Sequence, residues 1–298
     1  MQHCLYHPTY GYYTRQQAIG RTADFITAPC ITNLFGHTLA VWVVQQWEKL
    51  GSPPHWQLIE GGAGQGQLML DVCTALQKMA PSAYQNMQLY ILETSPAMQQ
   101  RQQKLLAGYN IQWLTAPHHI PDDKPTLFFA NELLDAFPVQ QHCGDKERQI
   151  VLHNDNFAFS CQDNVVEYPA QMITFLEQLK PKISAGLFID YGTDEEIQGD
   201  TLQAVQNHKK VDFFHQPGAT DLTTQVQFSQ VQKTLGPAAT TFTTQADFLL
   251  QHGLALLAEN SLRHAAAPER ENIEQAIERL IHPAQMGQRF KTLTFVRD

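Results

Sequence analysis

A glycine-rich segment at residues 61–66, Gly-Gly-Ala-Gly-Gln-Gly, separates a predicted short strand at 57–60 from a segment with helical periodicity at 68–79. Glycine adopts a positive φ without steric cost and lets a ligand approach the backbone closely. In doubly wound α/β sheets this combination forms the first strand-to-helix turn, where nucleotide-like ligands bind. The segment therefore predicts an α/β fold with a ligand site at the carboxyl ends of its strands.

The rest of the chain alternates between predicted strands and helices. Strands alternating with helices form right-handed βαβ units and a mainly parallel sheet, and continuously apolar strands are buried on both faces. We therefore expect a Rossmann-like doubly wound sheet with a closing strand at 290–296. The other strands are predicted at 89–92, 111–114, 126–130 and 187–190, and further helices at 32–50 and from Ser95-Pro96 to Gly108.

Two regions interrupt this alternation. Residues 139–168 hold short β-like runs around Asn154-Asp155-Asn156, which predicts a hairpin, and residues 193–240 are polar with weak periodicity. Insertions at strand ends commonly carry specificity. We therefore divide the chain into six parts. The core consists of residues 56–138, 169–192 and 241–298, and residues 1–55 form an N-terminal cap and helix. Residues 139–168 are a hairpin-like insertion, and residues 193–240 are a polar insertion and the candidate substrate region.

The charge balance limits the class of partner. The 298 residues include 20 Lys and Arg against 29 Asp and Glu, which gives a net charge of −9. Because no basic surplus is available to neutralise phosphates, we expect no nucleic-acid partner. A cationic partner is compatible with this charge.

Cysteine and histidine spacing point away from disulfides and metals. Five cysteines are scattered and never form a Cys-x-x-Cys pair, which argues against a disulfide framework and favours a reducing compartment. None of the 13 histidines has the spacing of a metal-binding motif, so we predict no metal. The N-terminus has no hydrophobic signal segment, and no apolar run reaches the length of about 18 residues that suggests a membrane span. We expect a cytoplasmic protein without membrane insertion.

The residues around the glycines discriminate between cofactors. A Walker-type loop needs Gly-Lys-Ser/Thr, whereas Gln67-Leu68 follow here, and a dinucleotide fingerprint needs the spacing Gly-x-Gly-x-x-Gly. Glu60 would repel a pyrophosphate but would form an ion pair with an amino group. S-adenosylmethionine (SAM) has an amino group, a sulfonium and no phosphate, so we predict that it binds at Glu60, Gly62, Ala63, Gly64 and Gly66. The alternative is a tight turn without a ligand.

Glu93 supports the same cofactor. It follows the predicted strand at 89–92, where a carboxylate can accept hydrogen bonds from both ribose hydroxyls of a nucleoside. The alternative is an exposed residue at a strand end. The order strand, glycine loop, helix, strand favours cofactor binding.

The segment 128–138 supplies the candidate catalytic residues. It follows a strand expected beside the glycine-loop strand and contains Asn131, Glu132 and Asp135. Arginine stays protonated in water, and carboxylates that bind one edge of its guanidinium can localise the charge there, leaving another nitrogen with more lone-pair character. We predict that Asn131 and Glu132 line the transfer site and leave Asp135 open between a site role and a solvated helix start. Tyr191, after the strand at 187–190, is either site lining or part of a turn.

These residues belong to an ordered set of segments that runs nearly the length of the chain. The chain resembles the MidA family of class I SAM-dependent methyltransferases, bacterial relatives of the mitochondrial complex I assembly factor that methylates an arginine. The matching segments include Leu5-Tyr6-His7-Pro8, Asp24-Phe25-Ile26-Thr27-Ala28-Pro29, residues 60–66, Glu93-Thr94-Ser95-Pro96, Asn131-Glu132, Asp190-Tyr191-Gly192, Asp221-Leu222-Thr223 and Met286-Gly287.

The resemblance implies a class I methyltransferase sheet of seven strands, mostly parallel with an antiparallel closing strand, and an inserted substrate-binding region. It implies an arginine-bearing protein substrate similar to the complex I subunit NuoD. It supports Gly62, Gly64 and Glu93 as SAM contacts and Asn131 and Glu132 as lining the transfer site. We further predict that Thr94 and Asn131 contact SAM, and the candidates for the substrate region are Asp24, Phe25, Tyr191 and Asp221. The chain departs from the family at four positions. Ala23 replaces a usual glycine, and Cys30 replaces a residue that is often glutamate. Gln225 and Gln227 replace a usual histidine and aspartate.

Three hypotheses of function follow. The first is a SAM-dependent protein arginine methyltransferase. The second is a non-catalytic assembly factor that binds SAM, and the third is a methyltransferase for a small molecule that uses Tyr191 or Asn131. A dehydrogenase is disfavoured by the loop spacing and by Glu60, and the sequence leaves open whether the protein forms a homodimer.

Overall fold

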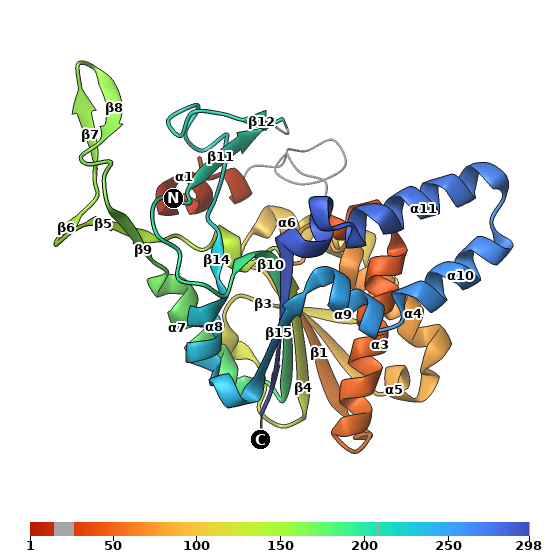
Figure 1. Cartoon of the computed structure of the whole chain (residues 1–298). Coiled ribbons are helices and arrows are strands. Elements are labelled where there is room, and N and C mark those ends of the chain that lie inside the picture. Colours follow the sequence, from red (N-terminus) through yellow and green to blue (C-terminus); the bar gives the residue numbers. More distant parts are fainter. Residues whose placement is uncertain (15–26, 208, 298) are drawn as a thin grey trace.

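The computed structural model describes residues 1–14, 27–207 and 209–297, and its centre is a twisted sheet with helices on both faces (Figure 1). The main path of the sheet has the strand order β15-β16-β10-β4-β1-β2-β3, and the two-residue strand β14 pairs with β10. Strands β1 to β4 and β10 are parallel, whereas β16 is antiparallel to both β10 and β15. The predicted doubly wound sheet with an antiparallel closing strand is therefore confirmed. The strands are β1 Trp56–Gly61, β2 Met87–Leu92, β3 Ile111–Leu114, β4 Thr126–Asn131, β10 Ala185–Thr193, β14 Val226–Gln227, β15 Thr240–Thr244 and β16 Phe290–Val296.

Alternate residues of the strands enter two apolar layers. In β4, Leu127 and Phe129 pack in one layer, and Phe128 and Ala130 pack in the other. This burial on both faces explains why the strands are continuously apolar. The first layer holds α3 Asn33–Lys49, α4 Gln67–Met79, α5 Pro81–Gln85, α9 Gln245–Gln251, α10 Leu254–His264 and α11 Ala267–Ile281, and the second holds α7 Ala170–Leu179 and α8 Phe228–Leu235.

Local sequence signals begin and end the helices near the site. Thr32 caps α3 by accepting a hydrogen bond from the Leu34 N–H at 3.2 Å, and Ser95 caps α6 (Pro96–Leu105) in the same way. Gly66, with φ +91°, precedes α4. The predicted helix starts at Thr32 and Ser95 are therefore confirmed, because side-chain caps are encoded by neighbouring residues.

The N-terminal segment, the hairpin-like insertion and the part of the polar insertion that precedes α8 lie at the carboxyl ends of the parallel strands. The predicted hairpin is confirmed as β7 and β8, whose turn residues Asn154 and Asp155 both have positive φ, and it projects from the body (Figure 1). The helices and strands at this end are α1 Gln2–Tyr6, α2 Ala28–Ile31, β5 Gln140–Cys143, β6 Lys146–Glu147, β7 Ile150–His153, β8 Asn156–Phe159, β9 Val165–Tyr168, β11 Gln203–Gln206, β12 Lys209–Lys210 and β13 Asp221–Thr223.

Short 3-10 or π turns occur throughout the described residues, at Tyr12–Thr14, Pro117–His119, Leu134–Ala136, Lys180–Lys182, Pro237–Ala239 and Pro283–Gly287.

Two features of the insertions differ from the sequence-based expectations. Cys143 and Cys161 form a disulfide between β5 and the segment after β8, although the cysteine spacing argued against disulfides. The pairing depends on strand register, which spacing along the chain does not reveal. In addition, α8 lies inside the segment predicted as a polar insertion, yet Phe228, Val231 and Leu235 are buried in the core.

Within residues 1–14, 27–207 and 209–297, no helix combines the length and the apolar character that crossing a bilayer requires.

Candidate functional site

A cavity of about 480 Å³ opens where β1, β2 and β4 end. Loops after parallel strands meet at the same edge of a sheet, so residues far apart in the sequence line one space. The N-terminal segment and the start of α7 complete the wall. The lining residues are Gln2, Tyr6, Tyr13, Thr14, Gly62, Gly64, Leu92, Glu93, Thr94, Ser95, Met98, Thr115, Ala116, Pro117, Glu132, Leu133, Ala136, Phe137, Pro138, Gln171 and Phe175.

The glycine loop turns tightly beneath this cavity. Gly62, Gly64 and Gly66 have φ values of +64°, +52° and +91°. A Cβ atom on Gly62 would lie 2.7 Å from Leu133 Cδ1, so the loop leaves no room for a side chain there. Gly62 and Gly64 line the cavity, whereas Ala63 and Gly66 stand outside the wall and hold the turn through a hydrogen bond from the Gly66 N–H to the Ala63 carbonyl at 2.7 Å.

Glu60 lies behind the loop instead of in the cavity wall. Its side chain is 2% exposed, accepts a hydrogen bond from the Met69 N–H of α4, and leaves Oε2 without a partner among the described residues. Burial, with smaller contributions from Asp71 and Glu93, raises the pKa of Glu60 to about 8. Direct contact between Glu60 and an amino group of a ligand stays a prediction, and the position of the carboxylate suggests support of the loop.

Glu93 lines the cavity, and hydrogen bonds hold both oxygens of its carboxylate. Its Oε1 accepts a hydrogen bond from the Ser95 N–H at 2.8 Å, and its Oε2 accepts one from Gln102 Nε2 at 3.1 Å. Burial raises the pKa of Glu93 above its usual range, and these hydrogen bonds oppose that shift. A carboxylate fixed in this way can still accept hydrogen bonds from two vicinal hydroxyls.

The sequence analysis did not identify Gln102, whose side chain links the glycine loop to Glu93 at the end of β2. Its amide nitrogen donates to the Gly64 carbonyl at 2.9 Å as well as to Glu93, and its Oε1 accepts from the Trp113 indole at 2.8 Å. Gln102 is fully buried. It stands in a glutamine-rich helix, where composition does not distinguish it from its exposed neighbours. The wall residues Thr115, Ala116, Pro117 and Leu133 were also missed, since no motif marks them.

Asn131 and Glu132 meet at the carboxyl end of β4. Asn131 Nδ2 donates to Glu132 Oε1 at 3.0 Å, and Asn131 Oδ1 is buried without a partner among the described residues. Glu132 has φ +52°, and its N–H donates to the Ile189 carbonyl at 2.8 Å. The Glu132 carboxylate also accepts a hydrogen bond from the Ala28 N–H. Burial and then Asp135 raise the pKa of Glu132 to about 8.

Asp135 stands next to Glu132, on a turn that Asp190 holds in place. Asp190 is fully buried, and its oxygens accept hydrogen bonds from the N–H groups of Leu134, Asp135 and Tyr191 at 2.9, 3.2 and 2.9 Å. The Tyr191 hydroxyl is hydrogen-bonded to the Asp135 carboxylate. Burial raises the pKa of Asp135 to about 6.

The polar insertion contributes Asp221, which joins Glu132, Asp135 and Asp190 as a fourth carboxylic acid. Asp221 on β13 is 7% exposed and accepts a hydrogen bond from the Tyr13 hydroxyl at 3.2 Å. Its charge raises the pKa of Glu132, so the two carboxylates lie within electrostatic reach. We call Glu132, Asp135, Asp190 and Asp221 the carboxylate cluster.

The structure thus brings together most of the predicted site residues. Gly62, Gly64, Glu93, Thr94 and Glu132 line the cavity, and Asn131, Asp135, Tyr191 and Asp221 surround Glu132. Asp24 and Phe25 lie outside the described residues. Among the residues that the structure describes, no group of three or more His, Cys, Asp or Glu side chains is arranged to hold a metal.

Comparisons with known proteins identify the family of this chain. Residues 38–162 and 144–245 match a family model of S-adenosyl-L-methionine-dependent methyltransferases. A Drosophila melanogaster relative named protein arginine methyltransferase NDUFAF7 homolog, mitochondrial, is 29% identical, with 98% of this chain and 79% of the relative covered. The Homo sapiens protein arginine methyltransferase NDUFAF7, mitochondrial, is 26% identical, with 97% and 77% covered.

A solved structure has the same fold over nearly the whole chain. It is a COG1565 superfamily member from Burkholderia thailandensis bound to S-adenosyl-homocysteine, with a TM-score of 0.84 and 27% identity, covering 99% of this chain and 86% of that one. A second structure of such a protein from the same organism gives a TM-score of 0.79 and 26% identity, with coverage of 99% and 85%.

Proposed function

The chain belongs to this family of S-adenosyl-L-methionine-dependent methyltransferases, and from that premise we propose that it methylates a guanidinium nitrogen of an arginine in a protein. The predicted enzyme class, the cofactor SAM and the resemblance to the MidA family are confirmed. The nature of the methyl acceptor is the part that we propose.

The cavity fits SAM by its chemistry. Glu93 presents a carboxylate for the ribose hydroxyls, and Gly62 and Gly64 allow close approach of the backbone. Among the residues that the structure describes, no lysine or arginine lines the cavity, in keeping with a cofactor that has no phosphate. When bound, SAM supplies an activated methyl group on a sulfonium.

The carboxylate cluster carries the proposal of arginine as acceptor. A guanidinium presents planar N–H groups that carboxylates bind in pairs, and it keeps its charge at any physiological pH. Glu132 lines the cavity, and Asp135 and Asp221 lie behind it. Binding of one guanidinium edge by Glu132 localises the positive charge there and leaves the opposite nitrogen with more lone-pair character. That nitrogen would form the new bond to the methyl carbon as the sulfur–carbon bond breaks and S-adenosylhomocysteine leaves. The methylated guanidinium would then lose one proton to the Glu132 carboxylate that holds its other edge, and a pKa of about 8 suits that carboxylate as a proton acceptor.

Relatives support a protein acceptor. The curated relatives are named protein arginine methyltransferases, and the family resemblance points to a subunit similar to NuoD of complex I. We propose such a subunit as the acceptor. Cytoplasmic location stays a prediction, as does the assembly state.

Methyl transfer to protein tests this function. We expect the wild type to transfer radiolabelled methyl groups from SAM to a NuoD-type subunit, with methylarginine identified by mass spectrometry. Glu132→Gln should lose at least about 100-fold in kcat/KM, because removal of a positioned acid–base group commonly costs that much. Glu259→Gln, at an exposed ion pair with Arg263, is the matched control and should keep full activity.

Other outcomes point to the alternatives. Full activity of Glu132→Gln would contradict the role of that carboxylate. SAM binding without methyl transfer to any protein would favour the non-catalytic assembly factor or a small-molecule acceptor.

A further inference from the structure

The hairpin-like insertion contains a small sheet with a polar network on its buried face and two large exposed hydrophobic side chains on its other face. Strands β6, β5 and β9 form this sheet, and in its β5–β9 ladder Gln141 pairs with Glu167, Gln140 with Tyr168 and His142 with Val166. Because successive residues of a strand point to opposite faces, Gln141 and Glu167 share one face, and Gln140, His142, Val166 and Tyr168 share the other, which we call the outer face.

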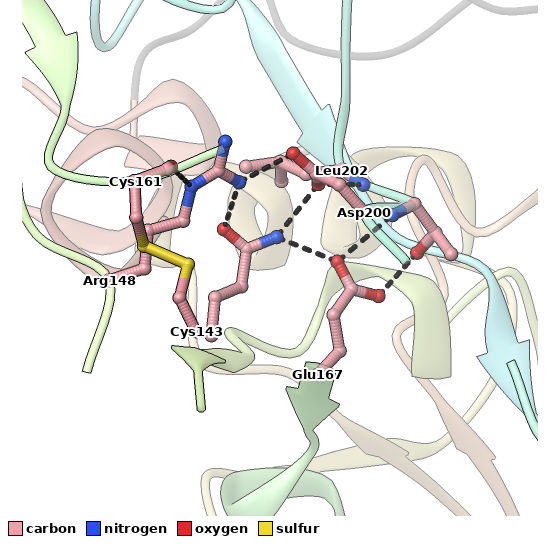
Figure 2. A network of polar contacts seen from close by, with 8 residues as sticks. Cys143, Arg148, Cys161, Glu167, Asp200 and Leu202 are labelled. Atoms are coloured by element: carbon pink, nitrogen blue, oxygen red, sulfur yellow. Dashed lines mark hydrogen bonds and ion pairs between the residues drawn. A yellow bond between two sulfur atoms is a disulfide. The ribbon is translucent and has the colours of Figure 1, made fainter. Parts of the chain in front are cut away.

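The inner face carries a network of polar side chains (Figure 2). Gln141 Nε2 donates to Glu167 Oε1 and to Asp200 Oδ1, both at 2.8 Å. Arg148, with only 5% of its side chain exposed, forms an ion pair with Asp200 and donates to the Cys161 carbonyl at 2.9 Å. The carboxylate of Glu167 accepts hydrogen bonds from the N–H and the hydroxyl of Thr201. This network fixes the insertion to the segment that leads into β11, and the Cys143–Cys161 disulfide links β5 to the end of the hairpin within the insertion.

The outer face, in contrast, exposes large apolar side chains. Val166 and Tyr168 are each 51% exposed, and Ile150, at the base of the projecting hairpin, is also 51% exposed. A sheet with one face on the protein normally places apolar residues inward and polar residues outward. We call Ile150, Val166 and Tyr168 the apolar patch, because exposed large apolar side chains are typical of a surface that another molecule covers.

This patch continues into the methyl-transfer cavity. A second cavity of about 340 Å³ lies between the two, and its wall includes Ile150 and the outer-face residue Gln140. The second cavity also contains Ala170, two positions after Tyr168. It shares three wall residues, Gln2, Pro138 and Gln171, with the methyl-transfer cavity. A track therefore runs from the outer face through the second cavity to Glu132.

We propose that this track is the docking surface of the protein substrate, which lies across it as an extended segment. Apolar side chains of the substrate pack on Ile150, Val166 and Tyr168, while its arginine enters the methyl-transfer cavity. Two observations select this occupant: the continuity of the track with the cavity, and the complementarity between a cationic arginine and the carboxylate cluster. A small acceptor would reach Glu132 without contacting the outer face. The inference rests on the proposed function and adds the surface that recognises the substrate.

The test is the double variant Val166→Asp/Tyr168→Asp, with Leu256→Asp as the matched control. Leu256 lies on α10, at the opposite end of the molecule in Figure 1, and is 71% exposed. We expect the double variant to raise the KM for a NuoD-type subunit by about tenfold or more with little change in kcat, as loss of apolar anchors does at interfaces. SAM affinity by calorimetry and the unfolding temperature should stay at the wild-type values in both variants.

Each other outcome has a distinct meaning. An unchanged KM in the double variant, with an active wild type, overturns the docking surface. A change from dimer to monomer by light scattering in the double variant would assign the outer face to a second copy of the chain and overturn the proposal as well. A wild type that methylates no protein contradicts the proposed function itself.

Discussion

At the scale of single residues, the backbone itself shapes the cavity wall. Gly64 and Glu132 both have φ +52° and both line the cavity. Glycine adopts this conformation freely, whereas a residue with a Cβ is strained in it, and such strain concentrates at functional sites. At Glu132 the surrounding contacts impose it: the N–H binds the Ile189 carbonyl, and the side chain binds Asn131.

Replacement of Gly64 tests the loop as the cofactor site. We expect Gly64→Val to weaken SAM binding by at least about tenfold, because a β-branched residue resists a positive φ and crowds the ligand. Gly108→Val is the control, since a Cβ there meets nothing within 4 Å. Calorimetric titration with SAM measures both, and equal affinity of Gly64→Val and the wild type would move the cofactor away from the loop.

The pKa of Glu132 predicts a pH dependence of catalysis. Burial raises this pKa to about 8, so the carboxyl is mostly neutral at pH 7 and cannot pair fully with a guanidinium. We expect kcat/KM for an arginine acceptor to increase as the pH rises through about 8. The measurement is the pH profile of kcat/KM, and the Glu132→Gln variant should lose this rise; a flat wild-type profile would contradict the prediction.

Glu60 predicts the opposite trend for stability. Its pKa is raised from 4.5 to about 8, so between these values the folded state holds a proton that the unfolded state has released. The free energy of unfolding therefore falls as the pH rises through this range, by up to about 1.4 kcal/mol per pH unit for one such group. Glu60→Gln should reduce the loss. Urea unfolding of the wild type and of Glu60→Gln at pH 6 and pH 8 measures this loss of stability. If the free energy of unfolding changes equally between the two pH values in both proteins, Glu60 does not have the raised pKa.

At the scale of elements, helix α6 organises the cofactor loops. Its residue Gln102 binds Gly64 and Glu93, and its cap residue Ser95 accepts a hydrogen bond from Met98 N–H while donating to the Tyr13 carbonyl at 2.6 Å. The helix therefore connects the glycine loop, the end of β2 and the N-terminal segment.

A comparison of two helix caps distinguishes an effect on stability from an effect on SAM binding. Ser95→Ala and Thr32→Ala each remove a cap and should each lower the free energy of unfolding by about 1 kcal/mol. Only Ser95 lines the cavity, so only Ser95→Ala should also weaken SAM binding. Chemical unfolding and SAM titration of both variants provide the comparison, and equal SAM affinities would show that the cap has no influence on the site.

At the scale of the whole molecule, separate parts of the chain converge on one end of the sheet. Tyr13 from the N-terminal segment binds Asp221 from the polar insertion, 208 positions away. Together with Glu132 and Asp135 from the core, they build an acidic site on a chain of net charge −9.

This charge predicts a dependence on ionic strength. A cationic acceptor is attracted over distances that salt screens, since the Debye length falls from about 30 Å at 0.01 M to about 8 Å at 0.15 M. We expect kcat/KM for the protein acceptor to fall as salt is added across this range, whereas SAM affinity changes less because its contacts are local. Equal salt dependence of the two quantities would contradict electrostatic attraction of the acceptor.

The sequence by itself determined the core and the cofactor. Adjacent residues encode the strand at 57–60, the glycine loop, the cap at Ser95 and the strand ends at Glu93 and Asn131, because hydrophobic period and turn chemistry act over a few positions. For that reason the parallel sheet and SAM binding could be predicted.

The tertiary structure alone decided what depends on contacts between distant residues. It paired Cys143 with Cys161, placed Gln102 between two loops, set Glu60 behind the glycine loop and brought Asp221 near Glu132. None of these contacts has a local signature, since burial and pairing arise only when the layers pack. For the same reason the sequence did not show that Val166 and Tyr168 are exposed, since only packing decides which face of the small sheet lies against the protein.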